Sequence, residues 1–207
     1  MRIMKKYLAI ALLSALAWPA SAQGILVVGD SISAAFGLEI SEGWVALLEQ
    51  RLQVEDEPVP VVNASVSGDT TAGGLARLPR LLERHEPDLV VIELGGNDGL
   101  RGMSPANMQQ NLSQMIETAQ ASGADVLLLG MRLPPNYGLR FTEAFAQVFV
   151  DLSDQHDVPL VPFLLTGIAG EPDQSLMQSD GIHPTAAAQQ RILDNAWPPI
   201  ETWLEAR

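Results

Sequence analysis

Residues 180–184 read Asp-Gly-Ile-His-Pro and hold one of only three histidines in the chain. In a turn, residues three positions apart can face each other, so the Asp180 carboxylate can accept a hydrogen bond from the His183 ring. That bond would fix the imidazole tautomer and leave the second ring nitrogen free to accept a proton from a hydroxyl group. The alternative is a plain helix cap, with Asp180 bonded to backbone amides and His183 exposed to solvent.

A candidate nucleophile lies near the start of the chain, where residues 29–33 read Gly-Asp-Ser-Ile-Ser after a short apolar run. If a base such as His183 accepts its proton, the Ser31 hydroxyl can attack a carbonyl carbon. Alternatively, Ser31 forms an ordinary turn, since serine is common in turns. Ser33 stands where the second glycine of a Gly-x-Ser-x-Gly elbow would be, which disfavours a hydrolase of the elbow type.

Two further segments could stabilise the negative charge that develops on a carbonyl oxygen during such an attack. Gly68, within Val-Ser-Gly-Asp-Thr, can turn a backbone amide toward a ligand, and Asn97, within Gly-Gly-Asn-Asp, can offer a side-chain amide. Taken alone, either residue is also explained as a turn residue. The neighbouring Asp30, Asp69 and Asp98 are expected to brace the loops rather than to react.

The elements that must position these residues are visible in the hydrophobic pattern. Five apolar runs without alternation are typical of strands covered on both faces, and they occupy residues 25–28, 59–62, 89–92, 126–129 and 158–163. Helical periodicity separates them, over residues 44–52, 75–82, 104–119 and 141–152, with a final helix after Pro184. Pro79 interrupts the second helical pattern. The alternation predicts an α/β fold, in which a parallel sheet has right-handed crossovers and helices on both faces.

In such a fold, ligands bind beyond the carboxyl ends of the strands. The Gly-Asp-Ser, Ser-Gly-Asp-Thr and Gly-Gly-Asn-Asp segments follow the first three apolar runs, and Asp-Gly-Ile-His-Pro lies between the fifth run and the last helix. This fold therefore brings a nucleophile, two oxyanion donors and an acid–base pair to one edge. Unrelated turn residues would not be expected to supply all of these groups together. We predict the catalytic residues Ser31, Asp180 and His183, and an oxyanion hole in which the Ser31 backbone amide joins the two donors, Gly68 and Asn97.

With these segments, the chain resembles the SGNH (GDSL) hydrolase family, which is named for the Ser, Gly, Asn and His of four sequence blocks. The corresponding residues here are Ser31, Gly68, Asn97 and His183, with Asp180 as the acid. Within the family, the chain is similar to the periplasmic multifunctional thioesterase/lysophospholipase/arylesterase subgroup. That similarity is carried by the segments VVNASVSGDT, GLARLP, ELGGNDGLRG, RLPPNYG and DGIHP.

The resemblance implies a three-layer αβα, flavodoxin-like sandwich around a five-stranded parallel sheet in the order 2-1-3-4-5. It also implies hydrolysis of acyl esters and thioesters through an acyl-serine intermediate, with no cofactor. Ile32 stands where the family name has leucine, a volume-conserving change that affects neither expectation. No metal is expected, because no histidine pair has the spacing of metal ligands and the chain has no cysteine.

An acyl-binding groove is predicted on the loops that flank the catalytic edge. The candidates are Leu75, Leu78, Met131, Leu133, Tyr137 and Ile182. These side chains could instead seal the top of the core, which is the better explanation for Leu78. Two other functions remain open: a carbohydrate acetylesterase of the same superfamily, which would need aromatic stacking surfaces such as Tyr137, and a non-catalytic ligand-binding protein, which would not need a Ser–His–Asp set.

The first 22 residues have the layout of a secretory signal peptide, with Arg2, Lys5 and Lys6 before an apolar run that ends in Ala-Ser-Ala. We therefore expect cleavage after Ala22, a periplasmic or secreted location and no membrane anchor. The length of residues 23–207 is that of one domain, the SGNH hydrolase domain.

Charge limits the partners of the mature chain. All 25 acidic residues follow residue 22 but only nine of the 12 basic residues do, which gives a formal charge of −16 without a single lysine. Such a surface repels nucleic acid and anionic lipid headgroups, so a nucleic-acid partner is excluded. We expect a monomer that acts on small acyl esters and thioesters, lysophospholipids among them.

Overall fold

The computed structural model describes residues 24–54 and 58–207, so the expected signal peptide lies outside the described residues. At its centre is a five-stranded parallel sheet with the order β2-β1-β3-β4-β5. The strands are β1 (Ile25–Gly29), β2 (Val61–Asn63), β3 (Leu89–Glu93), β4 (Asp125–Leu129) and β5 (Leu160–Val161). The predicted strand order 2-1-3-4-5 is confirmed.

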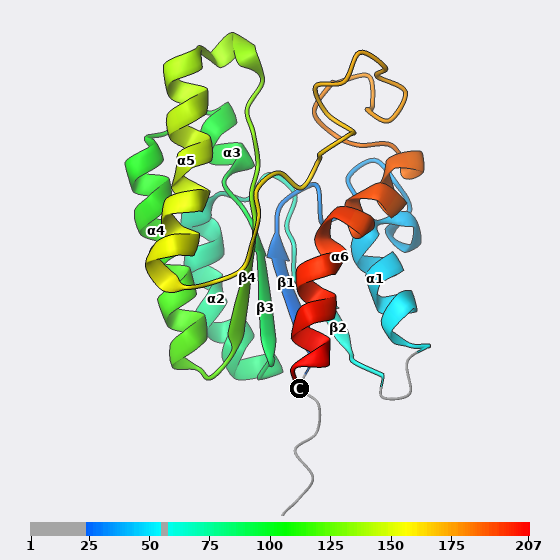
Figure 1. Cartoon of the computed structure of the whole chain (residues 1–207), viewed down its shortest axis with the longest axis vertical. Coiled ribbons are helices and arrows are strands. Elements are labelled where there is room, and N and C mark those ends of the chain that lie inside the picture. The colour runs from blue at the N-terminus through cyan, green and yellow to red at the C-terminus, as the bar shows by residue number, and fades with distance from the viewer. Residues whose placement is uncertain (1–23, 55–57) are drawn as a thin grey trace, which may run out of the picture.

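Helices cover both faces of this sheet (Figure 1). They are α1 (Trp44–Leu52), α2 (Thr71–His85), α3 (Gly96–Leu100), α4 (Pro105–Ala121), α5 (Leu139–His156) and α6 (Gln189–Glu205). Short 3-10 helices are η1 (Ile40–Glu42), η2 (Pro135–Tyr137) and η3 (Ala186–Ala188). In Figure 1, α1 and α6 pack together on one face, while α2, α4 and α5 lie on the other. The predicted three-layer αβα sandwich is confirmed.

The central strands are buried on both faces, which explains their uninterrupted apolar sequences. Every residue of β1 and of β3 is buried. The helices cover these strands with apolar stripes of 3.6-residue period. In α4, the buried residues are the five that the sequence places on one face, namely Met108, Leu112, Met115, Ile116 and Ala119.

Two helical segments depart from the sequence prediction. Helix α2 runs through Pro79, which lies on the exposed side of the helix, while Leu78 and Leu82 are buried against the core. Apolar burial on the inner face outweighs the backbone hydrogen bond that the proline removes. Helix α3 lies where the sequence predicts a loop, because glycine, asparagine and aspartate are typical turn residues.

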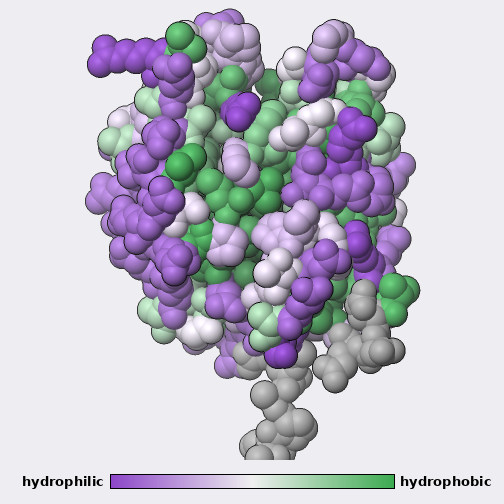
Figure 2. All heavy atoms as spheres, viewed as in Figure 1, coloured by the Kyte–Doolittle hydropathy of each residue, from purple (hydrophilic) through white to green (hydrophobic). Residues whose placement is uncertain are grey.

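The segments that carry the candidate residues lie at the carboxyl edge of the sheet. Residues 30–39 follow β1, residues 64–70 follow β2, α3 follows β3, and residues 162–185 lead from β5 toward α6. These segments lie at the upper end of the molecule in Figure 1. Figure 2 shows hydrophilic residues over the flanking helices and hydrophobic residues along the middle of this face, below a notch between two upper lobes. Within residues 24–54 and 58–207, no helix combines the length and apolarity that a membrane span requires.

Candidate active site

Ser31, His183 and Asp180 form one chain of hydrogen bonds at the carboxyl edge. His183 Nε2 lies 2.9 Å from Ser31 Oγ, and His183 Nδ1 lies 2.6 Å from Asp180 Oδ2. Asp180 Oδ1 also accepts hydrogen bonds from the backbone amides of Ile182 and His183. This tight turn holds the carboxylate beside the imidazole. Side chains that the sequence places on two separate loops are thus in contact, in the order hydroxyl, imidazole, carboxylate.

The Asp180 carboxylate is charged at neutral pH. The hydrogen bond with the His183 side chain, and then those from the backbone amides of His183 and Ile182, lower its pKa from 3.8 to about 2. An ionised Asp180 favours the imidazole tautomer with its proton on Nδ1, so that Nε2 can accept the proton of Ser31. The Asp180 side chain is 39% exposed and that of His183 is 16% exposed. Solvent therefore reaches the carboxylate more readily than the imidazole.

Consecutive turns after β1 hold Ser31. The Ile32 amide donates a hydrogen bond to Asp30 Oδ1 over 3.0 Å. The Phe36 amide donates one to the Ser31 carbonyl over 3.1 Å. Between them, Ala35 has a φ of +57°, a left-handed conformation that is costly for a residue with a side chain. These contacts fix the conformation of the loop and hold Ser31, which is half-buried, just beyond the carboxyl end of β1.

The Asn97 side chain is oriented by Asp30. Asn97 lies in the first turn of α3, after Gly95 at a φ of +115°. Its Nδ2 atom donates a hydrogen bond to Asp30 Oδ2 over 3.0 Å. A carboxamide nitrogen carries two hydrogens, so this bond occupies one and fixes the direction of the other. Asp30 therefore connects the loop of Ser31 to α3.

Gly68 lies on the loop after β2, exposed and with a φ of +78°, a conformation that glycine adopts without strain. Its carbonyl accepts a hydrogen bond from Arg101 Nη2 over 2.8 Å, which ties this loop to the residue that follows α3. On its other side, α3 is held by Asp98, whose carboxylate accepts a hydrogen bond from the Thr71 amide over 2.9 Å. The segments of Gly68 and Asn97 are therefore fixed relative to each other.

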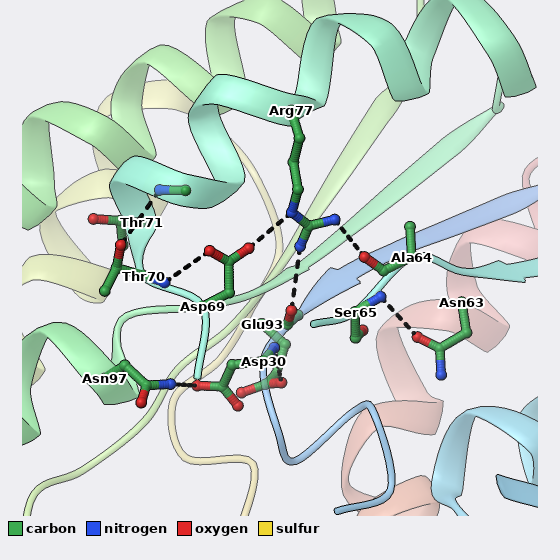
Figure 3. A network of polar contacts seen from close by, with 12 residues as sticks. Asp30, Asn63, Ala64, Ser65, Asp69, Thr70, Thr71, Arg77, Glu93 and Asn97 are labelled. Carbon is green, nitrogen blue, oxygen red and sulfur yellow. Dashed lines mark hydrogen bonds and ion pairs between the residues drawn. The ribbon is translucent and has the colours of Figure 1, made fainter. Parts of the chain in front are cut away.

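A buried polar network lies beneath the loop of Ser31 (Figure 3). Glu93, the last residue of β3, is fully buried, and its Oε2 atom accepts hydrogen bonds from Ser33 Oγ at 2.8 Å and the Asp30 amide at 3.2 Å. Ser33 in turn accepts a hydrogen bond from Trp44 Nε1 over 3.2 Å. Burial, followed by the negative charge of Asp30, raises the pKa of Glu93 well above 4.5. Burial therefore favours the protonated form of Glu93.

Asp30 is the charged member of this pair of acids. Burial raises its pKa from 3.8 to about 6, and the hydrogen bonds from the Ile32 amide and the Asn97 side chain oppose that effect. The Asp30 carboxylate is directed at the Asn97 amide, and burial favours the protonated form of Glu93. This division avoids two adjacent buried negative charges.

An ion pair braces the same edge from the side of α2 (Figure 3). Arg77 Nε lies 2.8 Å from Asp69 Oδ2. The terminal nitrogens of Arg77 donate hydrogen bonds to the carbonyls of Ala64 and Gly29. Arg77 thus joins the end of β1 to the loop after β2, and Asp69 holds the guanidinium in place.

Of the six residues predicted for an acyl groove, three are buried and three keep accessible surface. Leu78 is fully buried in the core beneath α2, so it does not line a groove, and the alternative favoured for this residue from the sequence holds. Met131 and Leu133 are only 7% and 9% exposed and belong to the same core cluster, so neither lines an open groove. The candidates that keep accessible surface are Leu75, Tyr137 and Ile182.

The loop after β4 folds back on α3, which explains this burial. Tyr137 Oη donates a hydrogen bond to the Leu100 carbonyl over 3.0 Å. Leu133 fills the space beside Gly99, where a Cβ atom would come within 2.5 Å of the leucine side chain. An apolar pocket of 480 Å³ opens beside this loop, lined by Pro105, Tyr137, Gly138, Leu139, Arg140, Phe141 and Ala144.

Two residues near the site were not singled out from the sequence. The first is Phe36, whose ring centroid lies 4.3 Å from that of His183. Phe36 is 47% exposed, and an aromatic residue on a loop of small residues five positions after Ser31 is the one signal that could have indicated it. The second is Glu93, which the sequence does not indicate because a carboxylate at the end of an apolar strand is usually solvated. In the part of the chain that the structure describes, no three side chains of the His, Asp and Glu types are grouped to hold a metal ion.

The sequence is similar to a known protein family and to proteins named as esterases and thioesterases. The model of the GDSL-like Lipase/Acylhydrolase family matches residues 27–191. Esterase TesA of Pseudomonas aeruginosa is 60% identical over 185 residues, which are 89% of this chain and 91% of that protein. Thioesterase 1/protease 1/lysophospholipase L1 of Escherichia coli strain K12 is 46% identical over 175 residues, which are 84% of this chain and 82% of that protein.

A solved structure extends the similarity to the fold. The psychrotrophic esterase EstA from Pseudoalteromonas sp., in a structure inhibited by monoethylphosphonate, superimposes with a TM-score of 0.83 at 42% identity. The alignment covers 88% of this chain and 99% of that one. The family match, these identities and the shared fold agree, and the chain belongs to the GDSL-like lipase/acylhydrolase family.

Proposed function

We propose that this protein is a serine hydrolase of acyl esters and thioesters, in which Ser31 is the nucleophile, His183 the general base and acid, and Asp180 the group that orients the imidazole. The observation that carries this assignment is the hydrogen-bond chain from Ser31 Oγ through the imidazole to Asp180, at 2.9 and 2.6 Å. Such a chain activates a serine hydroxyl. Relatives named as an esterase and as a thioesterase/lysophospholipase support the reaction class.

Acylation begins when Ser31 Oγ attacks the carbonyl carbon while His183 Nε2 accepts the hydroxyl proton. The ionised Asp180 stabilises the imidazolium that forms. When the tetrahedral intermediate collapses, His183 gives the proton to the leaving alcohol or thiol, and an acyl-serine remains. Water then attacks the acyl-serine, again with His183 as base, and the carboxylic acid is released.

Three donors are proposed for the oxyanion of the tetrahedral intermediate: the backbone amides of Ser31 and Gly68 and the side-chain amide of Asn97. The bond from Asn97 Nδ2 to Asp30 supports this role, because it leaves one amide hydrogen in a fixed direction. The left-handed backbone of Gly68 supports a loop conformation that few other residues would adopt. Donors fixed in advance stabilise developing charge without reorganisation.

We propose single-chain acyl esters and thioesters as substrates, lysophospholipids among them. Exposed apolar side chains at the carboxyl edge, Phe36 and Ile182 on loops and Leu139 at the start of α5, favour contact with an acyl chain. A carbohydrate acetylesterase is less well supported, because Trp44 and Trp197 are buried and cannot stack on a sugar, which leaves Tyr137 as the accessible residue of the aromatic set considered for stacking. A non-catalytic binding protein would give no reason for the serine–imidazole–carboxylate chain.

We further propose that residues 1–22 are removed as an export signal and that residues 23–207 form one domain that acts in the periplasm or outside the cell. The charged start, apolar run and small-residue end of the first 22 residues support export. The formal charge of −16 after residue 22 opposes self-association and supports a monomer.

Substitution of the nucleophile tests the assignment. Ser31→Ala should lower kcat on p-nitrophenyl esters to below about 10⁻³ of the wild-type value. The far-UV circular dichroism and the melting temperature of the variant should stay close to those of the wild type. The matched control is Ser67→Ala, which removes an exposed hydroxyl from a loop of the same edge and should keep its activity. Turnover by folded Ser31→Ala at the wild-type rate would contradict the assignment.

A further inference from the structure

Gln178 contacts both the loop that carries His183 and the loop that carries Ser31. Its backbone amide donates a hydrogen bond to the His183 carbonyl over 2.7 Å. Its side-chain Nε2 atom donates to the Phe36 carbonyl over 2.8 Å and to the Pro184 carbonyl over 2.9 Å. Both hydrogens of the carboxamide are therefore in use.

The contact continues from Phe36 to the proposed nucleophile. The Phe36 amide donates a hydrogen bond to the Ser31 carbonyl over 3.1 Å, while the Phe36 ring packs against the His183 ring. Gln178 is thus one hydrogen bond from the His183 backbone and two from the Ser31 backbone. Gly37 leaves room for the carboxamide, because a Cβ atom there would lie 2.6 Å from Gln178 Oε1.

The segment that carries Asp180 and His183 has little regular structure to hold it. Between β5 and η3, an isolated bridge pairs Met177 with Pro184, and the Gln178 amide bond closes a short loop. Those bonds set the shape of the loop but not its distance from Ser31. Among the hydrogen bonds between residues 30–42 and residues 166–187, all of which are described, two cross from one segment to the other: His183 to Ser31, and Gln178 to Phe36.

The first of these two bonds cannot maintain the geometry by itself. Ser31 loses its proton to His183 during acylation, His183 passes that proton to the leaving group, and Ser31 regains a proton taken from water at the end of deacylation, so the contact is broken and remade in each turnover. The Gln178–Phe36 bond takes no part in proton transfer. A displacement of about 1 Å at a catalytic contact can cost about 100-fold in rate.

We propose that Gln178 is a positioning residue, whose carboxamide holds the His183 loop against the nucleophile loop and so sets the distance between His183 Nε2 and Ser31 Oγ. The inference rests on the proposed function, since it assumes that His183 is the base for Ser31. On this proposal, a neutral side chain that is not part of the Ser–His–Asp set aligns that set.

Gln178→Met is the variant that isolates the hydrogen bonds, because methionine keeps the length and approximate volume of the side chain but has no donor. We expect kcat on a p-nitrophenyl ester to fall by about 10- to 100-fold, with KM changed by less than about twofold. The matched control is Gln174→Met. The Gln174 carboxamide lies on the same segment but bonds to the Glu171 carbonyl, so its kcat should stay at the wild-type value.

A second comparison separates positioning from general damage to the fold. Gln178→Met is combined with His183→Ala, and the residual rates with and without Gln178 are compared. If Gln178 acts through His183, its removal leaves the residual rate of His183→Ala unchanged. Gln178→Glu, which presents a carboxylate to two carbonyl oxygens, should be at least as slow as Gln178→Met and gives a second folded variant to measure.

Wild-type kcat in Gln178→Met, a loss confined to KM, or an equal loss with and without His183 would each overturn the inference. The proposed function would survive any of these results. It fails instead if Ser31→Ala retains turnover, so the two failures are distinguishable.

Discussion

The Asn97 side chain donates a hydrogen bond to the Asp30 carboxylate over 3.0 Å. This bond joins the residue before the proposed nucleophile to a proposed oxyanion donor. Because the free hydrogen of Asn97 Nδ2 points where Asp30 directs it, the effects of the two residues on kcat should be coupled.

Asn97→Ala is expected to lower kcat by about 10²- to 10³-fold with little change in KM, as loss of one oxyanion donor does. Asp30→Asn should also lower kcat, but much less in the Asn97→Ala background, because both changes act on the same donor. Steady-state kinetics of the two single variants, the double variant and the wild type measure the coupling. Additive losses would contradict it, and an effect of Asn97→Ala on KM alone would mean that Asn97 binds the substrate rather than the transition state.

Glu93→Gln should change how stability depends on pH. In the unfolded chain Glu93 ionises near a pKa of 4.5, whereas burial raises its pKa and keeps the proton on the folded protein. The folded state therefore binds more protons than the unfolded state above pH 4.5, so the contribution of Glu93 to stability falls as the pH rises from there. Glutamine does not titrate and keeps an acceptor for Ser33. Urea unfolding of both proteins at about pH 5 and about pH 8 measures their free energies of unfolding. Relative to the wild type, the variant should be more stable at about pH 8 than at about pH 5. A difference that does not change with pH would mean that the folded and unfolded pKa values of Glu93 are equal.

The acyl chain should be bound along apolar surface near the site. We expect kcat/KM to rise from acetyl to medium-chain p-nitrophenyl esters, because each buried methylene contributes about 0.8 kcal/mol of binding free energy. Leu139 is 72% exposed and lines the apolar pocket beside η2, so Leu139→Ser should reduce the gain for long chains and leave acetyl esters unaffected. Val150→Ser, at another exposed position of α5, is the control. A preference for acetyl over octanoyl esters would instead favour the carbohydrate acetylesterase.

Salt should stabilise the mature protein. Its formal charge of −16 makes the compact state repel itself, and salt screens that repulsion. The melting temperature is expected to rise between about 0.1 M and about 2 M sodium chloride. If the midpoint is the same at both concentrations, charge repulsion does not limit the stability of this fold.

The sheet and most helices could be predicted because burial leaves a periodic pattern. Strands covered on both faces must be apolar at every position, and α4 shows its inner face at the 3.6-residue period. Helix α3 could not be predicted, since it is a single turn built from Gly96 to Leu100 without such a period. Nor could the path of α2 through Pro79, which depends on packing beneath the helix.

The candidate site was predictable to the extent that residue type restricts chemistry. Ser31, Asp180 and His183 have few other reasons to occur in loops of the same edge. Their supports could not be predicted. A glutamine in a loop has no periodicity, and the bond from Gln178 to Phe36 joins residues 142 positions apart. The depth of an apolar residue near the edge was equally hidden, since Met131 and Leu133 are buried although Arg132 between them is exposed.

The central claim is that Ser31 is a nucleophile activated by His183. Reaction with a fluorophosphonate, followed by mass spectrometry of the digested protein, tests it most directly, because this probe forms a covalent bond with an activated serine. We expect one adduct per chain, on the peptide that contains Ser31, no adduct in Ser31→Ala and much slower labelling of His183→Ala. Labelling of Ser33 or Ser67 with Ser31 unmodified, or labelling at the same rate without His183, would contradict the claim.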